Sequence, residues 1–340
     1  MKQTVTIGGR AIGPGHPVFV IAEAGVAHFG DLDAACRLAD MAREAGADAV
    51  KFQVYSAERM ISAISPDWRQ RMGAKELRPD AVRALARHCR DTGIMFFASA
   101  HDEESVDLLE SLDVPAYKIG SGEVSNTPYL RRVARKRRPI VLSTGMYTLD
   151  DVREAMATLA EAGAEEVVLL HCVTAYPTPP ADANLRAMAT LQEAFDVPVG
   201  YSDHTVGYTI PLAAVALGAT AIEKHITFDK NRPGSQDSYV ACDREDLIAM
   251  IRGVREVEAA LGDGVKRPRP SELASRDWAR KSVVAAREIP AGTLITEGLL
   301  LCKRPGTGIP PNRMAEVVGR RAARTIPADH LVQLEDLEPA

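Results

Sequence analysis

The sequence predicts a (β/α)8 barrel, in which eight parallel strands alternate with eight helices. The main observation is a pattern that recurs along the chain: an amphipathic segment ends at a glycine, and a short apolar run follows. Two examples are AEAGAEEVVLLHC (160–172) and VALGATAIEKH (215–225). A glycine after a helix adopts the left-handed conformation, and an apolar run without alternation is typical of a strand buried on both faces. Strict alternation of helix and strand indicates a parallel sheet.

Eight such units follow one another within about 250 residues, the usual size of a TIM barrel. The expected strands lie near 18–23, 48–53, 94–99, 115–120, 139–143, 166–172, 197–201 and 219–225. The expected helices lie near 32–44, 79–91, 103–112, 126–135, 149–162, 183–194, 208–217 and 244–261. A doubly wound open sheet is the structural alternative because it shows the same alternation. The opening segment VTIGGRAIG predicts a small hairpin that caps the bottom of the barrel.

A second, smaller unit is expected after the barrel. The segment GDGVKRPRPSELASRD, which begins near residue 262, contains two prolines and many charges, as linkers do. From about residue 280 the chain shows short strand patterns and Gly/Pro turns, with LLLCKRPGTGIPP in the middle. We therefore expect a barrel domain over 1–262, a linker over 263–279 and a small β-rich domain over 280–340.

Composition and charge exclude several classes of protein. The formal net charge is −5, whereas a nucleic-acid binder usually carries a basic stripe. No run of about 18 apolar residues is present, so no transmembrane helix and no membrane partner are expected. The start, MKQTVTIGGR, lacks the apolar core of a signal peptide. The five cysteines have no metal-type spacing and are expected to be reduced thiols of a cytoplasmic protein.

Polar residues stand at the expected carboxyl ends of seven strands, where the catalytic residues of TIM barrels lie. These residues are Glu23, Lys51, Gln53, Lys118, Ser121, Glu123, Ser143, His171, Thr174, Tyr176, Ser202, Asp203, His204, Glu223, Lys224 and His225. Any single one of them could be a capping or packing residue. Agreement over seven strands is much harder to obtain by chance, and it predicts an active site at this end of the barrel.

A cation and two hydroxyls from neighbouring strand ends can form a phosphate cradle. Lys118, Ser121 and Ser143 have this arrangement. Lys51 adds a second cation that suits a carboxylate. A substrate that carries both a phosphate and a carboxylate fits the pair, and phosphoenolpyruvate is such a metabolite.

Two histidines, His204 and His225, follow the neighbouring seventh and eighth strands. Two imidazoles on adjacent strand ends can share a metal ion. The alternative is two unrelated histidines, one of them a buried hydrogen-bonding residue. Two nitrogen ligands without cysteine suit an open site for Mn²⁺ or Mg²⁺ better than structural zinc. Such an ion could polarise an aldehyde oxygen.

Several stretches, taken together, resemble the sialic acid synthase family. They are IAEAGVAHFG (21–30), AVKFQ (49–53), AYKIGSGEV (116–124), LSTGM (142–146), LHCVTAYPTP (170–179), GYSDHT (200–205) and AIEKHIT (221–227). The stretch KRPGTGIPP (303–311) resembles the C-terminal antifreeze-like domain of those enzymes, also called an SAF domain. The resemblance covers nearly the whole chain in order.

The resemblance implies an activity. The family condenses phosphoenolpyruvate with N-acetylmannosamine or a related amino-sugar aldehyde and releases phosphate and a nine-carbon 2-keto acid. It implies a divalent metal as cofactor, Mn²⁺ first, with Mg²⁺ or Co²⁺ as alternatives. It also implies a domain-swapped homodimer, in which the small domain of one subunit covers the barrel of the other.

The resemblance also implies roles for individual residues. The metal ligands would be His204 and His225. Glu23 would contact the sugar near the reacting carbon. Independently of the resemblance, the chemistry of the reaction suggests Lys51 and Lys118 as catalytic residues that stabilise the anionic ends, and either Glu23 or Glu123 as general acid or base. The substrate-binding residues would be Gln53, Ser121, Ser143, Thr174, Tyr176, Ser202, Asp237 and Arg304, the last from the partner subunit.

Departures from the family pattern fall at sugar-facing positions. Ala27 and Phe29 stand where the family has asparagines, and the loop that contains Ser235 and Gln236 is one residue longer. These departures predict the same reaction on an uncommon acceptor. The third strand ends in an unusual way, with Ala100 and His101, and His101 could face the substrate or be a satisfied loop histidine.

Two other functions remain possible on the sequence alone. One is another phosphoenolpyruvate-aldol synthase, which makes a shorter keto acid and is not expected to carry an SAF domain. The other is a non-catalytic carbohydrate-binding relative, against which the intact lysines and histidines argue.

Overall fold

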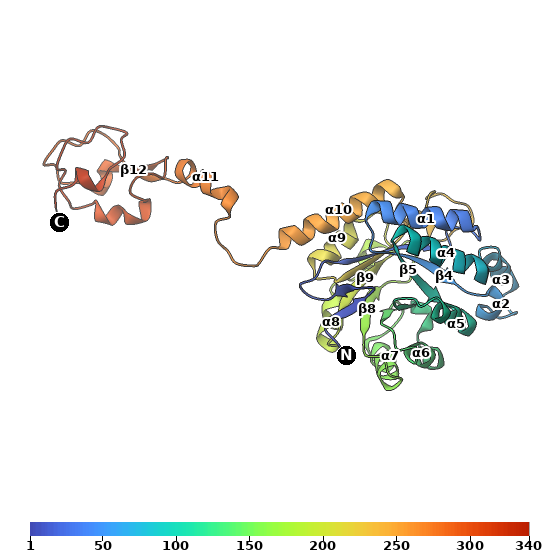
Figure 1. The fold of residues 1–340 in the computed structure, drawn as a ribbon. Helices are drawn as coiled ribbons and strands as arrows, with labels where there is room; N and C mark the ends of the chain where they lie inside the picture. Colours follow the sequence, from blue (N-terminus) through green and yellow to red (C-terminus); the bar gives the residue numbers. More distant parts are fainter. Residues whose placement is uncertain (340) are drawn as a thin grey trace. The chain divides into compact units, whose positions relative to one another are not determined.

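The computed structural model describes residues 1–339, and the chain divides into two compact units. The first unit is Met1–Gly262, and the second begins at Asp263. Figure 1 shows the first unit as a set of strands enclosed by helices.

Eight parallel strands close into a barrel in the order β10-β3-β4-β5-β6-β7-β8-β9. The bounds are β3 (Phe19–Gly25), β4 (Ala49–Val54), β5 (Met95–Ala100), β6 (Tyr117–Ile119), β7 (Ile140–Ser143), β8 (Val167–Cys172), β9 (Val199–Asp203) and β10 (Ala221–His225). The last strand, β10, pairs with the first, β3, which closes the sheet and excludes the open doubly wound alternative. The predicted (β/α)8 barrel is therefore confirmed.

The helices surround the strands, as the alternation predicted. Their bounds are α1 (Leu32–Ala45), α4 (Pro79–Thr92), α5 (Glu103–Ser111), α6 (Thr127–Ala134), α7 (Leu149–Glu161), α8 (Ala187–Ala194), α9 (Thr209–Ala216) and α10 (Arg244–Leu261). Gly46 and Gly93 end α1 and α4 in the left-handed conformation, with φ of 87° and 84°. Glycine takes this conformation without a Cβ clash, which is why the helix-end glycines marked the strand starts so well.

Two short helices, α2 (Ala57–Met60) and α3 (Pro66–Gly73), were not predicted. They lie in the long connection between β4 and α4, at the carboxyl end of the strands. Three 3-10 turns also lie in barrel loops: η1 (Ser121–Glu123), η2 (Pro180–Asp182) and η3 (Ser238–Val240). None of the residues of α3 is buried, so this helix carries no hydrophobic stripe by which it could be recognised.

The lowest level of the barrel interior is apolar and is closed by the N-terminal hairpin of β1 (Val5–Ile7) and β2 (Arg10–Ile12). Hairpin and strand residues form one cluster: Val5, Ile7, Ile12, Phe19, Ile21, Ala49, Phe97, Ala116, Val141, Val168, Leu170 and Ala221. Burial of these apolar side chains fixes the hairpin against the barrel, as the opening segment predicted.

Side chains alternate along a strand, so the next inward positions lie two residues further on. They are Glu23, Lys51, Ser99, Lys118, Ser143, Cys172, Ser202 and Glu223, and we call them the polar level. Every one of them is at most 5% exposed. Two residues beyond, where the strands end, lie Gly25, Gln53, His101, Gly120, Gly145, Thr174, His204 and His225, which we call the mouth level.

The second unit has a small core of its own. Strand β11 (Ser282–Ala285) pairs antiparallel with β12 (Leu300–Lys303), and the same unit contains the 3-10 turns η4 (Glu297–Leu299), η5 (Pro311–Glu316) and η6 (Leu334–Asp336). Apolar side chains such as Val283, Val317 and Val332 are fully buried there.

The segment that was expected to be a linker contains a helix, α11 (Pro270–Ala279). Pro270 occupies the first helical turn, where the missing N–H costs nothing, and the Glu272 carboxylate accepts from the backbone N–H of Arg269 at 2.8 Å. The prolines that suggested a linker thus include one that starts a helix. Among residues 1–339, no helix has the length and apolar character needed to cross a membrane.

Candidate active site

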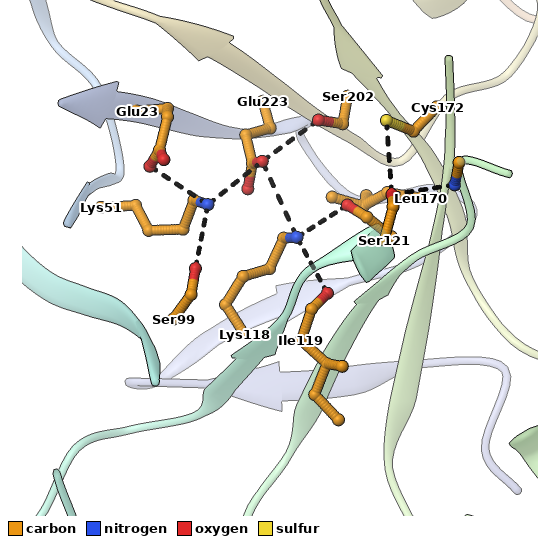
Figure 2. A network of polar contacts seen from close by, with 12 residues as sticks. Glu23, Lys51, Ser99, Lys118, Ile119, Ser121, Leu170, Cys172, Ser202 and Glu223 are labelled. Atoms are coloured by element: carbon orange, nitrogen blue, oxygen red, sulfur yellow. Dashed lines mark hydrogen bonds and ion pairs between the residues drawn. The ribbon is translucent and has the colours of Figure 1, made fainter. Parts of the chain in front are cut away.

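The polar level forms a single buried network of ions and hydroxyls, drawn in Figure 2. Lys51 Nζ lies 3.1 Å from Glu23 Oε2 and 3.4 Å from Glu223 Oε1. Glu223 Oε1 also lies 3.8 Å from Lys118 Nζ and accepts a hydrogen bond from Ser202 Oγ at 3.1 Å. Two lysines are therefore held in the barrel by two glutamates, and buried charges persist only when they are paired in this way.

The two glutamates have opposite pKa shifts although both are buried. Burial raises the pKa of Glu23 to about 7, against the opposing effect of Lys51. Burial also acts on Glu223, but Lys118 and Lys51 outweigh it and lower its pKa to about 2. Such separation of two neighbouring carboxyl groups is typical of active sites.

An anion cradle lies beside Lys118. Lys118 Nζ donates to Ser143 Oγ at 2.7 Å and to the Ile119 carbonyl at 3.1 Å, and the Gly145 backbone N–H donates to Ser121 Oγ at 2.9 Å. A Cβ on Gly145 would stand 2.3 Å from Thr174 Oγ1 and 2.8 Å from Ser121 Oγ. The absence of a side chain at Gly145 thus lets these two hydroxyls approach its backbone closely. A lysine, hydroxyls and a backbone N–H in one place can bind a phosphate.

His204 and His225 lie side by side at the mouth level, with their ring centroids 5.4 Å apart. His204 Nδ1 lies 2.7 Å from the Val173 carbonyl, which can only accept, so Nδ1 carries the proton and Nε2 keeps its lone pair. The Tyr176 ring packs against both, at 4.1 Å from His204 and 5.8 Å from His225.

These two histidines fit a divalent metal ion as nitrogen ligands. Burial lowers the pKa of His204 to about 4, with a further contribution from His225, and burial also lowers the pKa of His225. Both rings are therefore neutral at pH 7, as metal binding requires. Over residues 1–339 no group of three or more His, Cys, Asp or Glu side chains is placed to hold an ion. The remaining ligands would have to be oxygens from water or substrate, as at open catalytic sites.

The other predicted site residues lie at varying distances from this network. Gln53 Nε2 donates to Glu23 Oε1 at 3.3 Å, so it belongs to the network. Asp237 contributes to the pKa of His225 by its charge, so it belongs to the mouth. Glu123 accepts from Asn126 at 2.6 Å, at the start of α6, and takes no part in the ion pairs that join Lys51 and Lys118 to Glu23 and Glu223.

Arg304 belongs to the second unit. Its Nε donates to the Ala279 carbonyl at 3.0 Å, and its guanidinium lies over the Trp278 ring at 5.8 Å from the centroid. The predicted contact of Arg304 with a substrate stays a prediction, and so do the other individual roles.

Glu223 was among the polar residues predicted at strand ends but had no predicted role, and Ser99 and Cys172 were not predicted as site residues. Ser99 Oγ accepts from Lys51 Nζ at 3.3 Å, and Cys172 Sγ lies 3.7 Å from Ser121 Oγ. The signal that could have found them is the period of two along each strand, which puts all three in the polar level.

The chain matches known proteins over nearly its full length. A model of the NeuB family matches residues 38–266, and a model of the SAF domain matches residues 280–338. The chain belongs to the NeuB family. The predicted resemblance and the C-terminal SAF domain are therefore confirmed.

Several of the relatives are synthases of sialic acid or of related acids. The chain is 41% identical to an N,N'-diacetyllegionaminic acid synthase of Campylobacter jejuni, over 92% of this chain and 98% of that protein. It is 39% identical to the human N-acetylneuraminate-9-phosphate synthase, over 96% and 94%. The crystal structure of an N-acetylneuraminic acid synthetase from Leptospira borgpetersenii, in complex with citrate, covers 81% of this chain and 95% of its own, with a TM-score of 0.76 and 33% identity.

Family membership gives the general activity. The protein is a transferase of the nonulosonate synthase type, which condenses phosphoenolpyruvate with a sugar. The relatives differ in the sugar acid that they make, and pseudaminic acid synthases of Campylobacter jejuni are among them at 34% identity.

Proposed function

We propose that this enzyme joins phosphoenolpyruvate to an N-acylated amino-sugar aldehyde other than unmodified N-acetylmannosamine and releases phosphate and a nine-carbon 2-keto sugar acid. The observation that carries the proposal is the buried network of the polar level. It holds Lys51 and Lys118 side by side beneath the two neutral histidines. A three-carbon substrate with an anion at each end needs two fixed cations of this kind.

The two ends of phosphoenolpyruvate would bind on different strands. Its phosphate would lie in the anion cradle, against Lys118, Ser143 and Ser121. Its carboxylate would lie against Lys51 and Ser99, which already contact each other at 3.3 Å. Because Glu23 and Glu223 hold both lysines before substrate arrives, little reorganisation is needed on binding, and preorganised charges of this kind favour catalysis.

Chemistry would take place at the mouth level, above the bound phosphoenolpyruvate. A divalent ion on His204 and His225, Mn²⁺ by preference, would supply Lewis-acid polarisation of the acceptor aldehyde when bound. Carbon 3 of phosphoenolpyruvate forms a bond to the aldehyde carbon, water adds at carbon 2, and the tetrahedral adduct releases phosphate. Lys51 and Lys118 bind the negative ends throughout.

Glu23 is the better placed of the two candidate acid–base residues. Its carboxylate lies in the network at 3.1 Å from Lys51 Nζ, with Gln53 against the other oxygen, so it can accept the proton of the attacking water. Glu123 is engaged by Asn126 outside this network. The proposal therefore assigns the proton transfer to Glu23.

The expectation of an uncommon acceptor is supported by contacts at Phe29. The ammonium of Lys75 and the guanidinium of Arg232 both lie over its ring, at 4.8 and 4.6 Å from the centroid. Lys75 Nζ also donates to the Gly234 carbonyl at 2.7 Å. Phe29 thereby ties the loop after β3 to the loop after β10, and a sugar in the mouth would meet an aromatic ring and two cations at this rim.

The proposal is tested by phosphate release with phosphoenolpyruvate and a panel of N-acylated aldoses. The panel includes N-acetylmannosamine and its 6-phosphate, since a human relative makes a 9-phosphate product. We expect turnover with at least one aldose and poor turnover of N-acetylmannosamine. A kcat/KM for N-acetylmannosamine of about 10⁴ M⁻¹s⁻¹ or more would contradict the acceptor assignment. No phosphate release with any aldose would contradict the activity itself and favour a non-catalytic carbohydrate-binding role.

A further inference from the structure

His101 belongs to the mouth level but has no part in the reaction described above. It comes directly after β5, whose inward positions are Phe97 in the apolar level and Ser99 in the polar level. Ala98 and Ala100, which alternate with these inward residues along the strand, face the helices. The His101 backbone N–H still donates to the Val54 carbonyl at 3.1 Å, so the strand geometry extends to this residue. By alternation the imidazole faces the interior of the barrel.

The imidazole is fixed between two neighbouring strands. Its ring lies edge-on to the Tyr55 ring, with centroids 6.3 Å apart, on the β4 side. On the β6 side, a Cβ placed on Gly120 would stand 3.7 Å from His101 Cε1. Lys51 and Lys118 are on these same two strands, β4 and β6. His101 is therefore one level above the gap between the two lysines.

One nitrogen of this ring is buried without a partner. Within the described part of the chain, His101 Nε2 is shielded from solvent and makes no hydrogen bond. An unpaired buried polar atom costs free energy, and such atoms usually have a functional reason or a missing partner. Because His101 belongs to the mouth level, a ligand bound between Lys51 and Lys118 is the candidate for the missing partner of Nε2.

The electrostatic setting indicates what the partner is. Burial, Lys51 and Lys118 all lower the pKa of His101, to about 4. The ring is therefore neutral at pH 7 and has one N–H to donate. An anion drawn in by the two lysines selects the tautomer that carries the proton on Nε2. A neutral donor adds a hydrogen bond to the anion without placing a third positive charge beside the lysines.

We infer that His101 Nε2 donates a hydrogen bond to an oxygen of phosphoenolpyruvate bound across Lys51 and Lys118. The inference rests on the proposed function and adds a substrate-binding residue to it. The alternative partner is a bound water that has no role in substrate binding.

The test compares variants that keep or lose the donor. His101→Phe and His101→Met keep a side chain of similar bulk without a nitrogen, whereas His101→Gln presents an amide N–H near the position of Nε2. His88→Gln is the matched control, because His88 lies on α4 and bonds to Asp40, outside the barrel interior. The measurements are phosphoenolpyruvate affinity by calorimetry, without acceptor, and the melting temperature of each variant.

We expect His101→Phe and His101→Met to weaken phosphoenolpyruvate binding by about 10- to 100-fold, the usual effect of losing a hydrogen bond to a charged group. His101→Gln and His88→Gln should bind close to wild type. The melting temperature of the Phe and Met variants should not fall, since they remove an unpaired polar atom from the free enzyme. A merely structural histidine would give the opposite pattern, with lower stability and unchanged affinity.

Two results would overturn the inference and leave the proposed function intact. One is wild-type affinity in both His101→Phe and His101→Met, as a bystander water predicts. The other is equal weakening by Phe and by Gln, which would make ring shape the determinant instead of the donor. If the wild-type enzyme itself does not bind phosphoenolpyruvate, both the proposed function and this inference are wrong.

Discussion

Glu23 and Glu223 share one cation: Lys51 Nζ lies 3.1 Å from Glu23 Oε2 and 3.4 Å from Glu223 Oε1. Their strands, β3 and β10, are the first and last of the barrel and pair with each other. The shared lysine therefore lies at the seam where the sheet closes. The ion pairs of Lys51 with Glu23 and Glu223 therefore contribute both to closure of the barrel and to assembly of the anion site.

Glu223→Gln should destabilise the fold and the anion site together. Removal of one member of a buried ion network leaves the others uncompensated, and we expect the free energy of unfolding to fall by about 3–5 kcal/mol. Affinity for phosphoenolpyruvate should also change, because Lys118 loses its carboxylate partner. Denaturant unfolding and calorimetry measure the two effects. Glu44→Gln is the control, since Glu44 forms only exposed ion pairs, with Arg43 and Arg244. A stability loss equal to that of Glu223→Gln would refute the network's importance.

Gly145→Ala should block the anion cradle. The new methyl group would overlap the hydroxyls of Thr174 and Ser121, and backbone strain is not involved because Gly145 has no positive φ. We expect phosphoenolpyruvate affinity to fall by at least tenfold, about 1.4 kcal/mol. Gly122→Ala is a matched control in the preceding strand-end turn, where a Cβ meets no atom within 4 Å. Equal affinities of the two variants would place the phosphate elsewhere.

Removal of divalent metal should abolish turnover. After extended treatment with EDTA the enzyme should be inactive, and Mn²⁺, Co²⁺ or Mg²⁺ should restore it, because the acceptor aldehyde needs a Lewis acid. His204→Ala and His225→Ala should each lose Mn²⁺ binding in a calorimetric titration while the melting temperature shows a folded protein. Full activity of the chelated enzyme would refute the metal assignment.

Acid should destabilise the barrel partly through His28. Burial lowers its pKa from 6.5 to about 4 in the folded state, and its side chain is only 2% exposed. Between these two values the unfolded chain binds more protons than the folded one, so stability falls as the pH falls from about 6.5 to about 4, by about 3 kcal/mol in total for this residue.

His28→Asn should flatten that part of the stability profile. Asparagine keeps an oxygen that can accept from the Gly30 backbone N–H, as His28 Nδ1 does at 3.0 Å, but it does not titrate. Denaturant unfolding at a series of pH values gives the comparison. A wild-type slope in the variant would mean that His28 does not contribute.

The homodimer that the family resemblance implies, in which the second unit of one chain acts on the barrel of the other, leads to a numerical prediction. Glu23→Gln should inactivate the barrel, and Arg304→Ala should inactivate the other unit. Co-refolding of the two variants in equal amounts gives half mixed dimers, and half the sites in those would be whole, so activity should recover to about one quarter of wild type. If Arg304 acts within its own chain, mixing restores nothing.

The sequence predicts most of the barrel because each unit repeats the same local signals. Gly46 and Gly93 end helices in the left-handed conformation as predicted, and the following strands begin within one or two residues of their expected starts. Helices α2 and α3 were not predicted because they are short and polar. Helix α11 was not predicted because a proline such as Pro270 occurs both in linkers and in the first turn of a helix, and the local sequence does not distinguish the two.

The sequence predicts which residues lie at the site, but it does not predict which of their side chains contact one another. Polar residues at strand ends indicate the mouth of the barrel, yet only the closed sheet brings Glu223 next to Lys51 and Lys118. The need for glycine at position 145 depends on two hydroxyls from other loops, which no local pattern reveals. The free Nε2 of His101 likewise appears only when all its neighbours are known.

The hairpin of β1 and β2 closes the lower end of the barrel, so the interior is open only at the mouth level. Val5, Ile7 and Ile12 fill the floor, so nothing enters or leaves from below. A ligand seated at the polar level has to pass the mouth level in both directions, and a sugar held there stands in its way. For the proposed reaction we therefore expect an order of events: phosphoenolpyruvate, which binds deeper, enters first, and phosphate leaves only after the sugar product has left the mouth.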